Sequence, residues 1–221
     1  MASQPVTVAE RAYQIIKQRI LSGEYRPGLR LKESSLGQQF RISRTPVRDA
    51  LRTLNSEGLV DLMPNHGAKV ASWTAEELAE ISNIRVALES FAASLAAKKI
   101  TDEELVRLSA LADRMEAITA ASSTPDVSLI AELNLRFHQS VSEAARNPRL
   151  SIALSAVMEL PVIMRKFALF DTARLERSNA HHREIIAALA ARDAELAGAA
   201  MQLHILAARD LDARLAATVT V

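Results

Sequence analysis

The chain has 221 residues, of which 49% are apolar, and a formal net charge of +1, so it is long enough for two modest domains with their own cores. It contains no cysteine, which excludes disulfides, thiolate metal sites and cysteine nucleophiles. The longest run without a charged residue is 13 residues, shorter than the roughly 18 of a membrane span, and no signal sequence begins the chain, so we expect a cytoplasmic protein.

The charge is distributed unevenly along the chain. Residues 1–72 hold 11 Lys and Arg against 6 Asp and Glu, a net charge of +5, whereas residues 73–221 hold 16 against 20, a net charge of −4. A basic first part and an acidic second part are typical of a phosphate-binding domain joined to a partner domain that avoids nucleic acid. Chance fluctuation of a few charges is the alternative. We expect one domain over 1–72 and a second over 73–221.

The first elements are expected to be two helices and a turn. Apolar residues at helical spacing predict a helix over about 8–22, which Gly23 ends. A turn at 25–28 then leads into a short second helix over about 33–40. This small spacing is what helix-turn-helix geometry requires.

The stretch SRTPVRDALRTLNSEGLV, residues 43–60, predicts a third helix with marked ends. Thr45 is the expected N-cap, Pro46 suits the first helical position, and Gly58 stops the helix. An apolar stripe at spacings of four and three predicts the buried face, against the second helix and the first. The stripe consists of Val47, Leu51 and Leu54.

The opposite face of this helix carries side chains that suit an acidic partner. They are Arg44, Thr45, Arg48, Arg52 and Asn55. An arginine fork can bridge guanine O6 and N7 or a phosphate, and Thr or Asn can complete a contact to a base edge or backbone. A surface helix with solvated arginines is the alternative, since such rows are common.

Two short strands, at 60–63 and 68–71, are expected to follow as a hairpin around 64–67. The tip of such a wing can lie along a minor groove, where His66 and Lys69 are the available donors. His66 could equally be a simple turn residue.

The order of these elements resembles the winged helix-turn-helix of the GntR family of bacterial transcription regulators. The resemblance covers about seventy residues and is carried by LKESSLGQQFRI, SRTPVRDALRTLNSEGLV and PNHGAKVA. It implies a homodimer that binds double-stranded DNA at a palindromic operator. Family members often have arginine at the position of His66, so this chain departs from the pattern there.

From Thr74 onward the sequence predicts helices alone. Thr74 with Glu77 and Thr101 with Glu104 have the spacing of capping boxes. The expected helices cover 75–98, 102–121, a stretch ending at 146, 148–170, 172–191 and 193–217, with a kink at Pro161. The fold class is therefore mainly α, with a winged helix-turn-helix followed by a six-helix antiparallel bundle.

Three histidines of this second half are expected to meet inside the bundle. His138 shares a buried helix face with Asn134, His182 lies in heptad register with apolar neighbours, and His204 follows alanines at helical spacing. His181 should be rotated about 100° away from the buried stripe. Three converging imidazoles are typical ligands of zinc, nickel or a similar divalent metal. Taken singly, each histidine is more often a core or boundary residue.

The second half resembles the FCD ligand-binding domain of the FadR subfamily, and six helices suggest its VanR-like branch. The resemblance is carried by ISNIRVALESFAASLAA, NLRFHQSVSEAARNPRL and HHREIIAALAARDAELAGAAMQLH. In that domain an Asp and three His typically bind a metal, which maps the site onto Asn134, His138, His182 and His204. The carboxylate is missing here, and the extra positive charge favours a small carboxylate effector.

Arg85 is a second candidate anchor for that effector, although it could instead pair with Glu89, one turn along its helix. We therefore expect a homodimeric regulator in which a small organic acid controls operator affinity, with repression that the ligand relieves. Two alternatives remain open: the same regulator with an apolar or acyl effector and no metal, or a metal-dependent hydrolase. The hydrolase lacks an evident general base, since only Glu89 and Glu184 are remote candidates.

Overall fold

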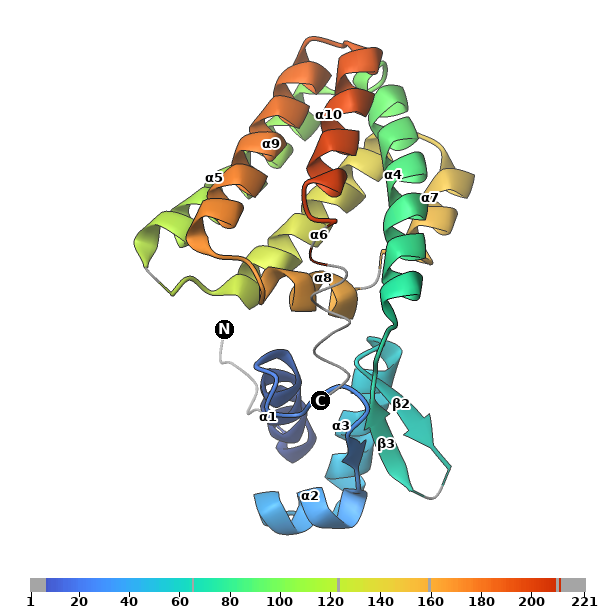
Figure 1. Ribbon diagram of the computed structural model, residues 1–221, viewed down its shortest axis with the longest axis vertical. Coiled ribbons are helices and arrows are strands. Elements are labelled where there is room, and N and C mark those ends of the chain that lie inside the picture. The colour runs from blue at the N-terminus through green and yellow to red at the C-terminus, as the bar shows by residue number, and fades with distance from the viewer. Residues whose placement is uncertain (1–6, 65, 123, 159, 210, 212–221) are drawn as a thin grey trace. The chain divides into compact units, whose positions relative to one another are not determined.

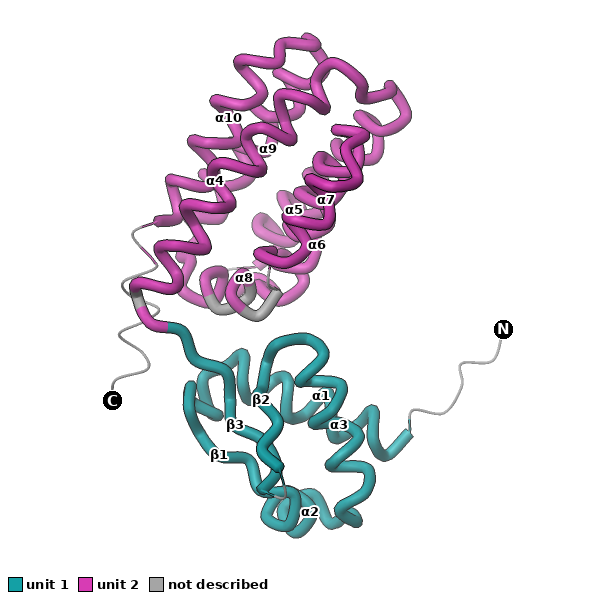
Figure 2. The backbone as a smooth tube through the Cα atoms, turned by 90° about the vertical axis from the view of Figure 1, so that its right-hand side faces the viewer, with its two compact units in different colours: residues 1–73, 216–221 teal, residues 74–215 magenta. Residues whose placement is uncertain are grey.

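The computed structural model describes residues 7–64, 66–122, 124–158, 160–209 and 211. The chain divides between Trp73 and Thr74 into two compact units, shown in different colours in Figure 2. Among the described residues, no helix combines the length and the apolar composition that crossing a membrane requires.

The first unit combines three helices with a small antiparallel sheet. The helices are α1 (Val8–Leu21), α2 (Glu33–Phe40) and α3 (Arg44–Ser56), and the strands are β1 (Arg30–Leu31), β2 (Val60–Met63) and β3 (Gly67–Val70). The strand order is β1-β3-β2, so β3 pairs with both neighbours. The strand β1 was not predicted, because two residues are too few to show an alternating pattern.

Helix α3 buries the stripe that the sequence predicted. Val47, Leu51 and Leu54 are each at most 1% exposed and belong to one core with residues of α1 and α2. The prediction of Thr45 as N-cap was wrong, because the helix begins at Arg44 and Ser43 occupies the cap position. Pro46 is therefore the third helical residue and not the predicted first, and it is tolerated because the N–H groups of the first helical turn have no partner within the helix.

Two glycines permit close backbone approaches in this unit. A Cβ on Gly37 of α2 would lie 3.0 Å from the carbonyl oxygen of Ile42, in the turn before α3. Gly67 has a φ of +86°, and a Cβ there would lie 2.1 Å from the carbonyl oxygen of Leu31 in β1. Both contacts involve backbone oxygens, so a larger residue at either position would displace the turn or the hairpin.

The second unit is made of helices, as predicted. In the described residues they are α4 (Ala75–Ala97), α5 (Asp102–Ala121), α6 (Val127–Ala144), α7 (Pro148–Ser155), α8 (Leu160–Phe167), α9 (Thr172–Ala190) and α10 (Ala194–Leu206). The two expected capping boxes are present, at the starts of α4 and α5. Helix α10 packs between α4 and α9 (Figure 1).

Two predictions about this unit were wrong in detail. The helix expected over 148–170 is two helices, α7 and α8, because a proline lacks a backbone donor and sits best in the first turn of a new helix. Helix α10 ends at Leu206 and a turn follows at 207–209, while the expected helical stretch 212–217 lies outside the described residues. Seven described helical segments also remove the basis for inferring the VanR-like branch.

Candidate functional site

The face of α3 that points away from the core is cationic. Arg44, Arg48 and Arg52 follow one another at intervals of four residues and are all exposed. Thr45 is exposed beside them. The helix therefore presents a row of guanidinium groups along one side, as the sequence predicted.

Glu33 at the start of α2 binds two of these arginines. Arg48 donates from Nε to Glu33 Oε1 at 2.9 Å and from Nη2 to Oε2 at 2.8 Å, and Arg44 Nη2 lies 3.5 Å from Oε2. Hydrogen bonding from Arg48 lowers the pKa of Glu33 below its usual value. The side chain of Arg48 remains 48% exposed, so the ion pair orients its guanidinium without enclosing it.

The other predicted DNA-contact residues lie around the hairpin. The side-chain oxygen of Asn55 accepts a hydrogen bond from the backbone N–H of Leu62 at 3.1 Å, which fastens α3 to β2. His66 and Lys69 are exposed on the β2–β3 hairpin, and the backbone N–H of His66 closes its turn on Met63. Asn55 thus has a structural contact that the sequence did not indicate.

The three predicted histidines meet in the second unit. His138 on α6, His182 on α9 and His204 on α10 offer nitrogen atoms that all lie within 4.8 Å of one another. The Nε2 atoms of His138 and His204 are 3.1 Å apart, and His182 Nε2 is 3.1 Å from Asn134 Oδ1. His138, His182 and Asn134 are at most 3% exposed, whereas His204 is partly buried.

The chemistry of this histidine cluster (His138, His182, His204) fits a divalent metal. Burial lowers the pKa of His182 and of His204 well below the usual range, so both rings are neutral and can donate a lone pair. The Nδ1 atoms of these two rings have no hydrogen-bond partner among the described residues. Their hydrogen-bonding contacts are made by Nε2, which lies against His138 Nε2 in His204 and against Asn134 Oδ1 in His182.

Glu89 on α4 connects the histidine cluster to Arg85. One carboxylate oxygen accepts from Arg85 Nε at 2.7 Å, and the other contacts His138 Nδ1. Burial opposes ionisation of Glu89, but attraction to Arg85 and His138 outweighs it and lowers its pKa to about 2. A carboxylate accepts only from N–H, so His138 presents a protonated Nδ1 to Glu89 and its Nε2 to the cluster.

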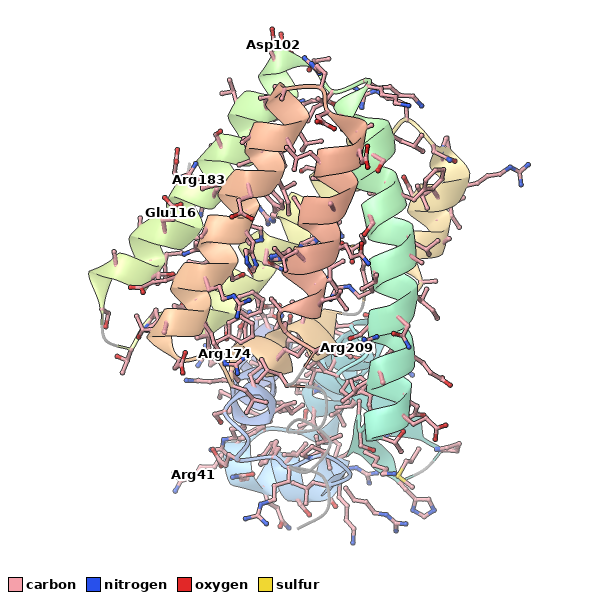
Figure 3. The ribbon with its side chains drawn as sticks, turned by 45° about the horizontal axis from the view of Figure 1, so that its top comes forward. Arg41, Asp102, Glu116, Arg174, Arg183 and Arg209 are labelled. Carbon is pink, nitrogen blue, oxygen red and sulfur yellow. The ribbon has the colours of Figure 1, made fainter. Side chains whose placement is uncertain are left out.

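A pocket of about 390 Å³ opens beside the histidine cluster. It is lined by Arg85, Asn134, Ile163, Lys166, Phe167, Phe170, Asp171, Ala173, Arg174, Arg177, Ser178, His181, His204, Ile205, Ala207 and Ala208. Figure 3 labels Arg174 near the start of α9. The volume is that of a site for a small molecule.

Several pocket residues were missed or misplaced by sequence reasoning. His181 is 7% exposed and lines the pocket, so the prediction that it points away from the interior was wrong. The reason is that α9 is buried on more than one face. Lys166, Arg174 and Arg177 were not predicted. The single helix expected over 148–170 gave no reason to place Lys166 on an inward face.

Comparisons with known proteins assign both parts of the chain to known domain families. Residues 8–70 match the model of bacterial regulatory proteins of the gntR family, and residues 80–207 match the FCD domain. The transcriptional regulator YdhC of Bacillus subtilis is 30% identical over 195 residues, covering 88% of this chain and 84% of YdhC. The gluconate operon transcriptional repressor of Bacillus licheniformis is 29% identical over 189 residues, covering 82% of this chain and 75% of that one.

A solved structure shares the fold. McbR/YncC of E. coli superposes with a TM-score of 0.66 at 25% identity, covering 91% of this chain and 95% of that chain. The matched domains and relatives are those of transcription regulators and not of enzymes, which overturns the hydrolase alternative. The chain is a DNA-binding transcription regulator of the GntR family, with an FCD effector-binding domain that fits the FadR subfamily.

Proposed function

We propose that this regulator binds a palindromic operator as a homodimer and represses transcription until a small organic acid occupies the FCD pocket beside a divalent metal. The first unit, up to Trp73, is the DNA-binding domain, and the second is the effector-binding and dimerisation domain. The exposed arginine row of α3, on a helix whose other face is buried, is the observation that carries the DNA-binding mode.

In this proposal α3 enters the major groove. Arg48 and Arg52 contact base edges or phosphates, Arg44 and Thr45 contact the backbone near the helix start, and Asn55 completes the row. His66 and Lys69 of the hairpin reach the adjacent minor groove or its phosphates.

Binding to DNA from the promoter of the protein's own gene tests this mode. We expect fluorescence anisotropy to show nanomolar binding, and the double variant Arg48→Ala/Arg52→Ala to lose specific affinity and lower the salt slope by about two phosphate contacts. The control is Arg107→Ala, an arginine of α5 that is 65% exposed. Unchanged affinity and salt slope in the double variant would contradict the assignment.

The metal would be held by His138, His182 and His204, with the amide oxygen of Asn134 as a fourth donor. When bound, the ion supplies a Lewis-acid position for an oxygen of the effector. Glu89 orients His138 through Nδ1, and Arg85, which pairs with Glu89 at 2.7 Å, lines the same pocket as the candidate second anchor for an acid.

Metal content tests this site directly. Zinc and nickel in the purified protein should approach one ion per chain, and His138→Ala or His204→Ala should remove most of it. His66→Ala is the matched control, since His66 lies in the other unit. Full metal content in both cluster variants would show that the histidine cluster does not hold the metal. The alternative would then be a pocket without metal that binds an apolar or acyl effector.

Exposed apolar side chains on α4 and α10 support the homodimer. Ile84 and Phe91 on α4 are 44% and 53% exposed, and Leu196 and Leu203 on α10 are 53% and 48% exposed. Each pair is seven residues apart and therefore lies on one helix face. Since α4 and α10 pack against each other, the two faces are candidates for one interface.

The oligomeric state tests this interface. Phe91→Glu/Leu203→Glu should give a monomer by light scattering, whereas Val106→Glu, at a 68% exposed site on α5, should stay dimeric. A dimer in both variants would show that the dimer forms through another surface and not through these faces of α4 and α10.

A further inference from the structure

Among the described residues, the non-glycine positions with a left-handed backbone conformation are all arginines. They are Arg41 (φ +56°), Arg146 (φ +51°) and Arg192 (φ +56°), and they follow closely on the ends of α2, α6 and α9. A residue with a Cβ is strained in this conformation, which glycine adopts freely at helix ends. Strained residues of this kind are concentrated at functional and binding sites.

The side chains of Arg146 and Arg192 have partners within the second unit. Arg146 donates to Glu104 Oε1 at 2.8 Å and to a backbone carbonyl of α6 at 3.0 Å. Arg192 donates to Asp102 Oδ1 at 3.1 Å and to the carbonyl oxygen of Ile100. Both arginines therefore join the end of one helix to the start of α5, which is a structural role.

The side chain of Arg41 has no such contact. Its guanidinium makes no hydrogen bond or ion pair with the described residues, and only its backbone N–H bonds to α2. The side chain is exposed, and Figure 3 shows it directed outward from the first unit. A strained arginine without a partner in its own domain points to a partner from outside the chain.

Arg41 lines a groove between α2 and the start of α3 that suits an anion. Ser34, Gln38, Ser43 and Arg44 line the same groove, and none of its described lining residues is acidic. Ser43, the N-cap of α3, makes no side-chain hydrogen bond to the first turn of the helix. In a helix-turn-helix, the helix before the recognition helix crosses the DNA backbone, which brings this turn close to phosphate oxygens.

We propose that Arg41 binds a phosphate of the DNA backbone, in the groove that it shares with Arg44. The contact adds affinity for any duplex and fixes the register of α3, because backbone contacts carry no sequence information. The inference rests on the proposed entry of α3 into the major groove. It adds to that interface a residue that lies outside both α3 and the hairpin.

The substitution Arg41→Gly separates this role from a structural one. Glycine adopts the left-handed conformation without strain, so the melting temperature should not fall. Anisotropy titrations should show binding weaker by about fivefold at physiological salt and a salt slope smaller by about 0.9, as expected for one lost phosphate contact. The affinities for operator and unrelated duplexes should fall by the same factor.

Further variants supply the second measurement and the controls. Arg41→Asn also tolerates this backbone conformation and should match the glycine variant, whereas Arg41→Lys keeps the charge and should keep the salt slope. Arg146→Gly and Arg192→Gly make the same exchange at the same backbone conformation in the second unit. Both should leave the operator affinity unchanged.

Each other result overturns the proposal. Unchanged DNA affinity and salt slope in Arg41→Gly, with a lower melting temperature, would assign Arg41 to stabilising the end of α2. A loss of affinity confined to the operator would indicate a contact to a base and not to a phosphate. If Arg48→Ala/Arg52→Ala loses operator affinity and Arg41→Gly does not, the binding mode of α3 stands and this inference alone fails.

Discussion

Glu33 and Arg48 form a two-point ion pair between the second and third helices of the first unit, with donor–acceptor distances of 2.9 and 2.8 Å. Both contacts use the side of the guanidinium that includes Nε, so they fix the plane of the fork relative to α3. A DNA-reading arginine that is held in one orientation loses less conformational entropy when it meets a base. In the proposed DNA-binding mode, Glu33 is therefore a positioning residue for Arg48.

The substitution Glu33→Gln should lower the sequence specificity of DNA binding and raise the affinity for unrelated DNA. Loss of a negative charge from the arginine-rich face strengthens attraction to any phosphate backbone, while Arg48 loses its fixed orientation. We expect tighter binding to unrelated duplexes and a ratio of specific to unrelated affinity that falls about tenfold. Anisotropy titrations on operator and scrambled DNA measure both. Glu24→Gln, at a 56% exposed site in the same unit, is the control.

The same ion pair predicts a pH dependence of stability. Arg48 lowers the folded-state pKa of Glu33 below 4.5, so the stabilisation is fully present above pH 4.5 and is lost as the pH falls through the lowered value. The difference in melting temperature between wild type and Glu33→Gln should therefore be largest near neutrality and shrink toward pH 3. A difference that stays constant from pH 7 to pH 3 would contradict this linkage.

The substitution Glu89→Gln should weaken metal binding. The carboxylate fixes the ring of His138 and raises its basicity, and loss of such a contact typically costs 10- to 100-fold in affinity. Competition with a chelating dye measures the change. Glu80→Gln, an exposed glutamate of the same helix, should leave the affinity unchanged.

The substitution Asn134→Asp should strengthen metal binding, in contrast to Glu89→Gln. It places an anionic oxygen where a neutral amide now lies 3.1 Å from His182 Nε2, and a divalent ion prefers the anion. We expect tighter metal binding and weaker binding of acidic effectors, because the site becomes one charge less positive. If metal affinity does not rise, Asn134 does not face the ion.

The substitution Arg183→Gln should affect stability alone. Arg183 on α9 bonds Glu116 on α5 at 2.7 and 2.6 Å and Asp113 at 2.6 Å, and Figure 3 shows Arg183 beside Glu116. The partners are exposed to solvent, so the expected loss is only about 0.5–1 kcal/mol, and it should diminish in 1 M salt. Urea unfolding at two salt concentrations checks this, and operator affinity should not change.

The sequence predicted features that depend on local spacing. The buried stripe of α3, the capping boxes of α4 and α5 and the meeting of three histidines all follow from periodicity within single helices. The role of Glu89 did not follow, since its contact with His138 joins residues 49 positions apart. The position of Lys166 in the pocket lining did not follow either, because the sequence alone allows Pro161 either as a kink or in the first turn of a helix.

Helix α4 carries both Arg85 and Glu89, and it begins five residues after β3 ends at Val70. Helix α4, which lines the pocket with Arg85, is therefore joined to the β2–β3 hairpin by residues 71–74 alone. In the proposed function, a ligand that shifts α4 would act on the first unit through this covalent connection. We expect the two units to be exchangeable. A chimera that joins another DNA-binding domain to residues 71–74 and the second unit should respond to the same effector at a different operator.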